Sequence, residues 1–365
     1  MSRDRLQINK NFKEDLMTMY NAYGFKNFKV NRFEEYDVYV ENKDFFADKG
    51  VITFMDTDGK LLALKPDVTL SILKNVKDNS GEIEKYCYCE SVFRVSARSR
   101  RFEEMTQIGV ESIGPLFDYH IAEVLLQAVN TLRNISKESE LAVSNLEVIA
   151  LAFQVAGIPR EIQPRITALM GAKNLHELQS LCEKEGVSEE GMVLLKELML
   201  LSGSIRQVCK RLQMLLGSFD ENGCIETMEN ILKPLENENI RLDFTVVSNM
   251  KYYNGFVFLG YIKGIPDAVL FGGQYDRLLQ QMKKGCKGMG FALDVELLLA
   301  YLEEDTKEDM DVVLLYEDGV SIARLMETAK EIVKEGRSVL VEKELRPSLC
   351  YNEVIKLEAE NGRDD

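Results

Sequence analysis

Paired cysteines, a secretory leader and long apolar runs are all missing from this sequence of 365 residues. Its seven cysteines are an odd number with no CxxC spacing, and its first residues, 1–5, are polar. These absences argue against a disulfide framework, and we expect free thiols in a reducing cytoplasm. Cys87 and Cys89 share a strand face, which favours buried small side chains over a metal site. Without an apolar run long enough to cross a bilayer, we expect no membrane association.

Positive charge is also scarce. The chain has 45 Lys and Arg against 60 Asp and Glu, a formal charge of −15. Nucleic-acid binders usually present a strongly basic face, so this balance argues against tRNA as a partner. The one dense basic cluster consists of Arg94, Arg98, Arg100 and Arg101.

This cluster interrupts residues 86–114, which otherwise alternate as two strands do. Side chains two apart on a strand share a face, so Gln107, Gly109 and Glu111 point the same way. At about 3.3 Å per residue, Gln107 and Glu111 stand roughly 13 Å apart. A small molecule lying over Gly109 would meet polar groups at both ends. Read alone, the stretch is equally consistent with a hairpin that carries a solvated basic loop.

The remaining pattern predicts a mixed fold. A helix is expected over 5–23, a strand over 28–39, a hairpin over 51–64 with an Asp-Gly turn, and helices over 115–132 and 146–156. In this setting Asp67 and Thr69 fall where a strand gives way to a helix, so by themselves they are read as helix caps. His120 and His176 are read as residues at helix starts.

Composition changes along the second half of the chain. Leu, Met, Glu and Lys dominate about 158–239, where helical periodicity predicts an insertion of short helices. An acidic linker, 303–309, precedes a βαβα pattern whose last helix is expected near 348–358. From Met310 onward there are eight Lys and Arg against thirteen Asp and Glu, a net charge of −5. A segment this acidic is expected to bind tRNA weakly.

Several of these segments together resemble one family. The chain is similar to the class II aminoacyl-tRNA synthetases in their histidyl form, although its basic loop is about one residue shorter. The matching segments are Phe93-Arg94 with Gln107-Ile108-Gly109-Val110-Glu111, Lys65-Pro66-Asp67-Val68-Thr69, Tyr252-Tyr253, Gly272-Gly273-Gln274-Tyr275-Asp276 and Gly288 to Glu296.

The resemblance implies both a fold and a site. The fold would be α+β, an antiparallel sheet flanked by helices over 1–302, with a truncated α/β remnant of an anticodon-binding domain over 310–365. In the family, a helix and strand near the start build a dimer, and we expect a dimer here. The implied histidine-binding residues are Asp67 and Thr69 for the α-amino group, Gln107 and Glu111 for the amino acid, and Tyr253 for the imidazole.

The departures from the family bear on chemistry. Ser248 and Leu297 stand where the family has arginines, and Lys65 replaces the arginine of the Arg-Pro-Glu-Gly-Thr motif. Activation of an amino acid by ATP concentrates negative charge at the α-phosphorus, and losing one stabilising donor typically costs about 10²–10³ in rate. Arg94 is left as the candidate anion contact, unless it pairs with a carboxylate. We therefore expect histidine binding with no catalytic residue, no cofactor and no metal.

Binding without activation resembles a paralogous family, the regulatory subunits of ATP phosphoribosyltransferase. Its members pair with a short catalytic subunit, in a hetero-octamer, and mediate inhibition of the first step of histidine biosynthesis by histidine. Two other interpretations stay open: a divergent histidyl-tRNA synthetase, and a synthetase-like protein that binds another amino acid. The residues do not decide whether the histidine sensor is this pocket or a subunit interface.

Overall fold

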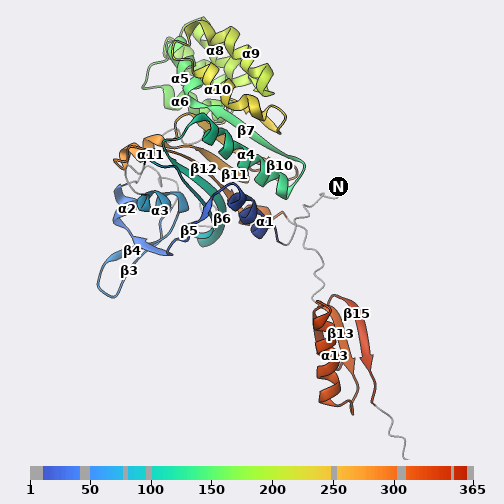
Figure 1. Ribbon diagram of the computed structural model, residues 1–365. Helices are drawn as coiled ribbons and strands as arrows, with labels where there is room; N and C mark the ends of the chain where they lie inside the picture. The colour runs from blue at the N-terminus through green and yellow to red at the C-terminus, as the bar shows by residue number, and fades with distance from the viewer. Residues whose placement is uncertain are drawn as a thin grey trace, which may run out of the picture. The chain divides into compact units, whose positions relative to one another are not determined.

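The computed structural model describes residues 11–41, 50–76, 81–95, 101–247, 253–301, 310–346 and 349–359 (Figure 1). By contacts the chain divides into two compact units, residues 1–302 and residues 303–365. The expected acidic linker, 303–309, and the basic-loop residues Arg98 and Arg100 lie outside the described residues, as do Ser248 and Tyr252.

A nine-stranded sheet forms the centre of the first unit. From one edge to the other its strands are β1 (Lys26–Asn27), β5 (Glu84–Val95), β6 (Phe102–Gly114), β12 (Lys287–Asp294), β11 (Leu270–Gln274), β10 (Phe256–Ile262), β7 (Ser139–Asn145), β9 (Ile240–Asp243) and β8 (Ser202–Gly203). Neighbours from β5 through β7 are antiparallel, whereas β1 pairs with β5 and β7 with β9 in parallel. The predicted α+β fold with a large antiparallel sheet is confirmed.

Helices flank this sheet. Those of the first unit, in the described ranges, are α1 (Phe12–Ala22), α2 (Asp37–Glu41), α3 (Val68–Asn75), α4 (Asp118–Ile135), α5 (Leu146–Val155), α6 (Gln163–Gly171), α7 (Leu175–Lys184), α8 (Glu189–Leu200), α9 (Ile205–Leu216), α10 (Cys224–Leu232), α11 (Asp276–Gln281) and α12 (Val295–Leu299), with 3-10 turns η2 (Gly217–Phe219) and η3 (Lys233–Leu235). α4 contacts β6, β7, β10 and β12, and α1 packs on α4 and β5. These two helices therefore cover one face of the sheet.

Alternation along β6 separates the core from the site. Ile108 and Val110 join the main hydrophobic core under α4. Because successive side chains on a strand point to opposite faces, Gln107, Gly109 and Glu111 lie on the other face. This second face, which packs against a smaller hydrophobic cluster that includes Val68 of α3 and Leu278 of α11, thus carries the residues singled out from the sequence.

The predicted helical insertion is present as helices α6 to α10, which gather with α5 at one end of the first unit (Figure 1). Side-chain caps start two of these helices: Asn174 accepts a hydrogen bond from the N–H of Glu177 at 3.2 Å, and Ser188 accepts one from Gly191 at 3.0 Å. The two-residue strand β8 pairs with β9, which attaches the insertion to the edge of the main sheet.

A separate three-stranded sheet shows that the strand predicted over 28–39 is shorter than expected. The predicted strand over 28–39 is limited to β2 (Phe33–Glu35), and α2 begins at Asp37, a residue that favours helix starts. β2 pairs with β4 (Leu61–Leu64), which forms the predicted hairpin with β3 (Thr53–Met55). Asp56 shapes its turn by accepting the N–H groups of residues 58 and 60.

The second unit has a three-stranded parallel sheet in the order β14 (Val339–Glu342), β13 (Met310–Tyr316) and β15 (Tyr351–Leu357), with helix α13 (Ile322–Lys334) packed on β13 and β14. The predicted last helix over 348–358 is wrong, because this stretch forms β15. A short apolar run fits either element by spacing alone. The β-branched pair Val354-Ile355 and an available edge of β13 favour the strand.

Candidate ligand-binding site

The start of α3 positions the first of the predicted site residues. Asp67 caps this helix, since its Oδ1 accepts the backbone N–H of Leu70 at 3.3 Å. Oδ2 of Asp67 lies 3.6 Å from Nη2 of Arg94, and Nε of Arg94 donates to the carbonyl of Pro66 at 2.7 Å. Arg94 is thus engaged by a carboxylate and a carbonyl of the chain, the pairing that the sequence left open as an alternative to an anion contact.

Glu111 lies at the centre of the site. Thr69 Oγ1 donates to its Oε1 at 2.6 Å, and the hydroxyl of Tyr275 donates to its Oε2 at 2.5 Å. Glu111 is only 1% exposed. Burial raises the pKa of its carboxyl to about 8, the two hydroxyl hydrogen bonds lower the pKa, and the nearby charge of Asp67 raises it. The site therefore holds a carboxyl group that is poised to change charge near neutral pH.

Three glycines make room for the polar side chains. A Cβ on Gly290 would lie 1.9 Å from Oε2 of Glu111. A Cβ on Gly109 would lie 2.6 Å from the hydroxyl of Tyr88, and one on Gly273 would lie 2.8 Å from the ring of Tyr253. Because β6, β12 and β11 are adjacent, these side chains lie side by side against bare backbone.

Gln107 marks the other end of the predicted site. It lies on the same face of β6 as Glu111 and is opposite Asp294 of β12 and Glu90 of β5. Its side chain is 8% exposed and makes no hydrogen bond within the described part of the chain. Glu90 itself accepts a hydrogen bond at 2.7 Å from Lys65, which is fully buried. The structure thus brings the predicted residues together on one face, with Gln107 separated from Glu111 by Gly109.

Two tyrosines of this site were missed by the sequence argument. Tyr275 belongs to a motif that was recognised, yet its contact with Glu111 depends on how β11 is placed across the sheet. Tyr88 lies on a strand that was predicted, but its contacts were not. Its hydroxyl lies over Gly109, 3.4 Å from the carbonyl of Phe291. In the sequence, the only sign of these contacts was the glycines on the neighbouring strands, which leave room for large side chains.

The departures from the synthetase pattern have structural explanations. Leu297 packs partly buried against the main hydrophobic core, where an arginine would bury a charge. Gln274, in the matching segment Gly272-Gly273-Gln274-Tyr275-Asp276, accepts the N–H of Phe256 at 2.7 Å. Gln274 thus fixes the start of β10 and supplies no charge to the site.

The cysteines, the acidic residues and the helices bear on sites of other kinds. All seven cysteines are free thiols, Cys87 being buried and Cys89 exposed. Within the described ranges, His, Cys, Asp and Glu form no group of three or more suited to a metal ion. No helix there has the length and apolar character needed to cross a membrane. His120 lies at the predicted helix start and caps it, because its Nδ1 accepts the N–H of Phe117 at 3.3 Å.

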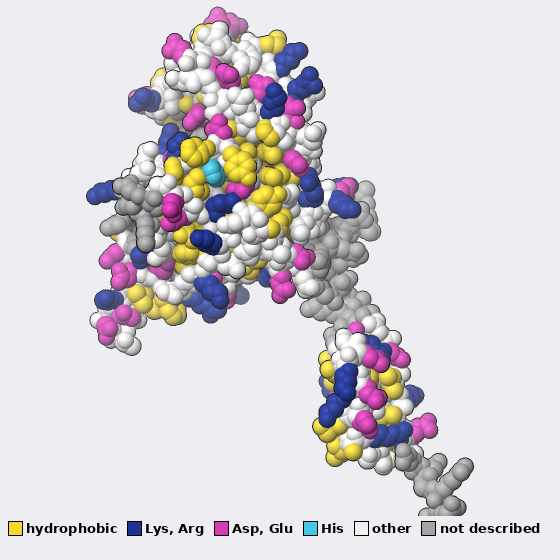
Figure 2. Space-filling view, in the orientation of Figure 1, with side chains coloured by type: hydrophobic (Ala, Val, Ile, Leu, Met, Phe, Trp, Pro, Cys, Tyr) yellow, Lys and Arg dark blue, Asp and Glu magenta, His cyan; other side chains and the backbone are white. Residues whose placement is uncertain are grey.

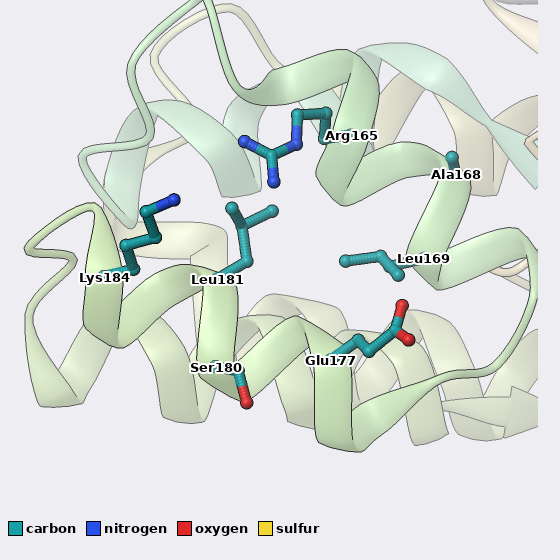
Figure 3. Close-up of a pocket in the computed structure, with 7 residues that line it drawn as sticks. All are labelled: Arg165, Ala168, Leu169, Glu177, Ser180, Leu181 and Lys184. Atoms are coloured by element: carbon teal, nitrogen blue, oxygen red, sulfur yellow. The ribbon is translucent and has the colours of Figure 1, made fainter.

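A cavity of about 440 Å³ lies far from these residues in sequence, between α6 and α7 of the insertion (Figure 3). Leu169 and Leu181 supply its apolar wall, and Arg165, Lys184 and Glu177 place charges at its rim. None of the predicted site residues lines it.

The fold and the candidate site together indicate the class of protein to which the chain belongs. An antiparallel sheet with α1 and α4 on one face and a buried cluster of polar side chains over glycines on the other matches the core of a class II aminoacyl-tRNA synthetase. The sequence profile described as histidyl-tRNA synthetase matches residues 2–298, so the chain belongs to the histidyl-tRNA synthetase family.

Individual relatives refine this placement. An ATP phosphoribosyltransferase regulatory subunit of Caldanaerobacter subterraneus is 28% identical over 353 residues, which cover 92% of this chain and 90% of the relative. One from Ruminiclostridium cellulolyticum is 24% identical over 92% of this chain and 83% of its own. The predicted resemblance to this group of proteins is confirmed.

Solved structures agree on the fold. A protein from Bacillus halodurans, described as an ATP phosphoribosyltransferase regulatory subunit/histidyl-tRNA synthetase, has a TM-score of 0.78 at 22% identity and covers 96% of this chain and 94% of its own. The ATP phosphoribosyl transferase (HisG:HisZ) complex from Thermotoga maritima matches with a TM-score of 0.60 at 18% identity, over 79% of this chain and 98% of that one.

Proposed function

We propose that this chain is the regulatory subunit of an ATP phosphoribosyltransferase, required by a short catalytic subunit and sensitive to histidine in the first step of histidine biosynthesis. The observation that carries the proposal is the full-length similarity to relatives of that name. We place it in the cytoplasm, where its seven free cysteines would stay reduced.

The site supports binding without activation. Activation would need fixed cations around the α-phosphate of ATP. Arg94 is engaged by Asp67 and Pro66, and Leu297 stands where the family has an arginine. The chain would therefore bind an amino acid and leave it unchanged.

Histidine is the ligand that the pocket fits best. The carboxylate of Asp67 and the hydroxyl of Thr69 suit an ammonium group. Glu111, with Gln107 on the same face of β6 and Tyr253 over Gly273 of β11, suits a ring that carries N–H groups. Feedback inhibition requires that histidine bind the inhibited state of the complex more tightly than the active state.

The partners follow from this role. We propose a hetero-oligomer with the catalytic subunit, a hetero-octamer in the family, built on a dimer of this chain. Figure 2 shows hydrophobic side chains gathered around a histidine on one face of the first unit. At the start of α4, Phe117 and Tyr119 are 64% and 66% exposed, with rings 5.8 and 5.5 Å from that of His120.

This aromatic patch, defined as Phe117, Tyr119 and His120, adjoins the region expected to form the dimer. Nζ of Lys85 donates to the carbonyl of Tyr23, which follows α1, at 2.5 Å and to Glu123 of α4 at 2.8 Å. Exposed aromatic side chains are enriched at protein interfaces. We therefore assign the dimer contact to α1 and the start of α4.

The test is reconstitution with a short-form catalytic subunit. Its rate of phosphoribosyl-ATP formation should rise when this chain is added and fall again as histidine is added. The same samples should be assayed for histidine-dependent exchange of pyrophosphate into ATP. No stimulation and no co-elution, together with such exchange, would instead make the chain a divergent synthetase.

A further inference from the structure

The second unit is small and buries few apolar side chains. It comprises residues 303–365. The fully buried apolar side chains in its described part are Val312, Val313, Leu314 and Ile332. On β15 the apolar side chains Val354, Ile355 and Leu357 are only half-buried. Units of this size are marginally stable alone and commonly gain stability by association, so a partner that covers β15 would stabilise this one.

The sheet of this unit has two edges of different length. β13 lies in the centre, β14 forms one edge with four residues, and β15 forms the other edge with seven (Figure 1). Within the described residues, no further strand pairs with either edge. A short edge strand presents few backbone groups, whereas a long one is a template for another strand. β15 is therefore the edge to which a strand can be added.

The hydrogen bonds between β13 and β15 show which groups of β15 point outward. The N–H of Glu317, directly after β13, donates to the carbonyl of Leu357 at 3.1 Å, and the parallel register is unbroken over 312–316. Backbone groups of successive strand residues point alternately to either side. Because those of Leu357 face β13, the N–H and C=O groups of Val354 and Lys356 point away from it. These two residues thus present two donors and two acceptors at the outer edge.

We propose that β15 pairs with β15 of a second copy of this chain, antiparallel and across a two-fold axis, so that the two sheets become continuous. In an antiparallel pair, opposite residues whose backbone groups face each other exchange both N–H···O=C bonds. When Val354 lies opposite Lys356 of the second copy, and Lys356 opposite its Val354, the outward groups of both residues are paired in both copies. The two-fold axis then passes between the two copies of Ile355.

The side chains of β15 suit this alignment and this partner. Opposite residues of a continuous sheet share a face, so Ile355 packs on its own copy as a close, non-hydrogen-bonded pair, and Glu353 lies opposite Leu357. No like charges are opposed in this register. An axis at Glu353 would instead set two glutamates opposite each other, which is unfavourable. A two-fold contact between identical chains is also the commonest form of association.

Proline at the outer edge tests the contact on the full chain. Phe117 and Tyr119 are replaced by Ala throughout, so that the contact proposed for α1 and α4 does not contribute. Val354→Pro removes an outward N–H from each copy and leaves the bonds between β15 and β13 in place. Association in sedimentation equilibrium should weaken at least about tenfold, because two backbone bonds are lost and the rings clash at the contact.

The other edge of the same sheet supplies the matched control. The N–H of Val312 donates to the carbonyl of Ser338 at 3.0 Å, so the backbone groups of Val341 on β14 point outward as those of Val354 do. Val341→Pro therefore removes the same kind of group from the opposite edge. Its association should equal that of the chain without a proline change.

A disulfide tests the register. Opposite residues of a non-hydrogen-bonded pair have Cα atoms about 4.5 Å apart, a distance that a disulfide can bridge. In a chain whose exposed Cys89 and Cys350 are replaced by serine, Ile355→Cys should give covalent dimers under mild oxidation. Val341→Cys, a half-exposed position on β14, should give none at the same chain concentration.

Equal yields of covalent dimer from the two cysteine variants would overturn the β15 contact, and so would equal association of the two proline variants. If Val354→Pro fails to fold, the cysteine variants decide, because they keep the backbone donors of the strand. Histidine and the catalytic subunit take no part in these measurements. The outcome is therefore separate from that of the regulatory role, which the reconstitution assay tests.

Discussion

Gly109, Gly273 and Gly290 stand on three adjacent strands, and a polar or aromatic side chain from another position lies over each of them. From the sequence, Gly109 was expected to leave room for a small molecule, whereas in the structure the hydroxyl end of Tyr88 lies over it. The contacts over the other two depend on strand register, which alternation alone does not fix. Thr69 and Glu111 were assigned to one site only through the resemblance, and in the structure a hydrogen bond of 2.6 Å joins them although 42 positions separate them.

Gly290→Ala tests the space above the sheet. Its Cβ would lie 1.9 Å from Oε2 of Glu111 and 2.4 Å from the carbonyl of Val110, so the carboxylate must move. We expect histidine affinity to fall at least tenfold in calorimetry, with a loss of about 1–3 kcal/mol in unfolding free energy. Gly171→Ala, whose Cβ would lie 3.0 Å from the side chain of Val247, is the control and should leave affinity unchanged.

Tyr275→Phe removes one donor from Glu111 and keeps the ring. The lost hydrogen bond to a carboxylate should weaken histidine binding by about 1.5–3 kcal/mol, roughly 10- to 150-fold in calorimetry. Tyr351→Phe, at the start of β15, removes a hydroxyl from the second unit and should change nothing. Equal affinities for the two variants would exclude Tyr275 from the site.

At the scale of elements, an ion-pair cluster holds the insertion to the sheet. Asp243 of β9 accepts hydrogen bonds from Arg241 at 2.5 Å, from the Thr245 hydroxyl at 2.5 Å and from Lys173, after α6, at 3.4 Å. Burial acts to raise the pKa of Asp243, but the hydrogen bonds of Thr245 and Arg241 outweigh it and lower the pKa. The cluster is therefore stabilising wherever Asp243 is ionised.

Asp243→Asn should lower the free energy of unfolding by about 2 kcal/mol in urea titrations at pH 7, since it weakens hydrogen bonds to a charged group. The sign of the pH effect follows from the lowered pKa: this contribution is complete above the ordinary aspartate pKa and is lost as pH falls through the folded value. The parent and variant curves should converge at acidic pH. Glu138→Gln, in an exposed pair with Lys263, should cost less than about 0.5 kcal/mol.

Element types were predicted best where the periodic segment was long. The helices of the insertion and the long strands β5 and β6 match their patterns, whereas the stretch ending in β15 was assigned to a helix. A run of seven residues gives little periodicity, and pairing with β13 decides its conformation. Tertiary contacts, and not local preference, set the structure of such short segments.

At the scale of the whole molecule, the proposed regulatory role requires association with other subunits. The aromatic patch of Phe117, Tyr119 and His120 should carry much of the dimer contact, because buried aromatic side chains dominate the energy of many interfaces. Replacing both Phe117 and Tyr119 by Ala should weaken dimerisation at least tenfold in sedimentation equilibrium. Phe219→Ala, an exposed aromatic change in the insertion, should not. A dimer unaffected by the double change would place the contact elsewhere.

The short strand β8 has a consequence for motion within the first unit. Ser202 and Gly203 continue the main sheet by pairing with Asp243 and Leu242. A swing of the helical insertion away from the sheet therefore has to break these backbone bonds first. Amide hydrogens at this edge should exchange with solvent deuterium together with those of the neighbouring helices, as one cooperative opening.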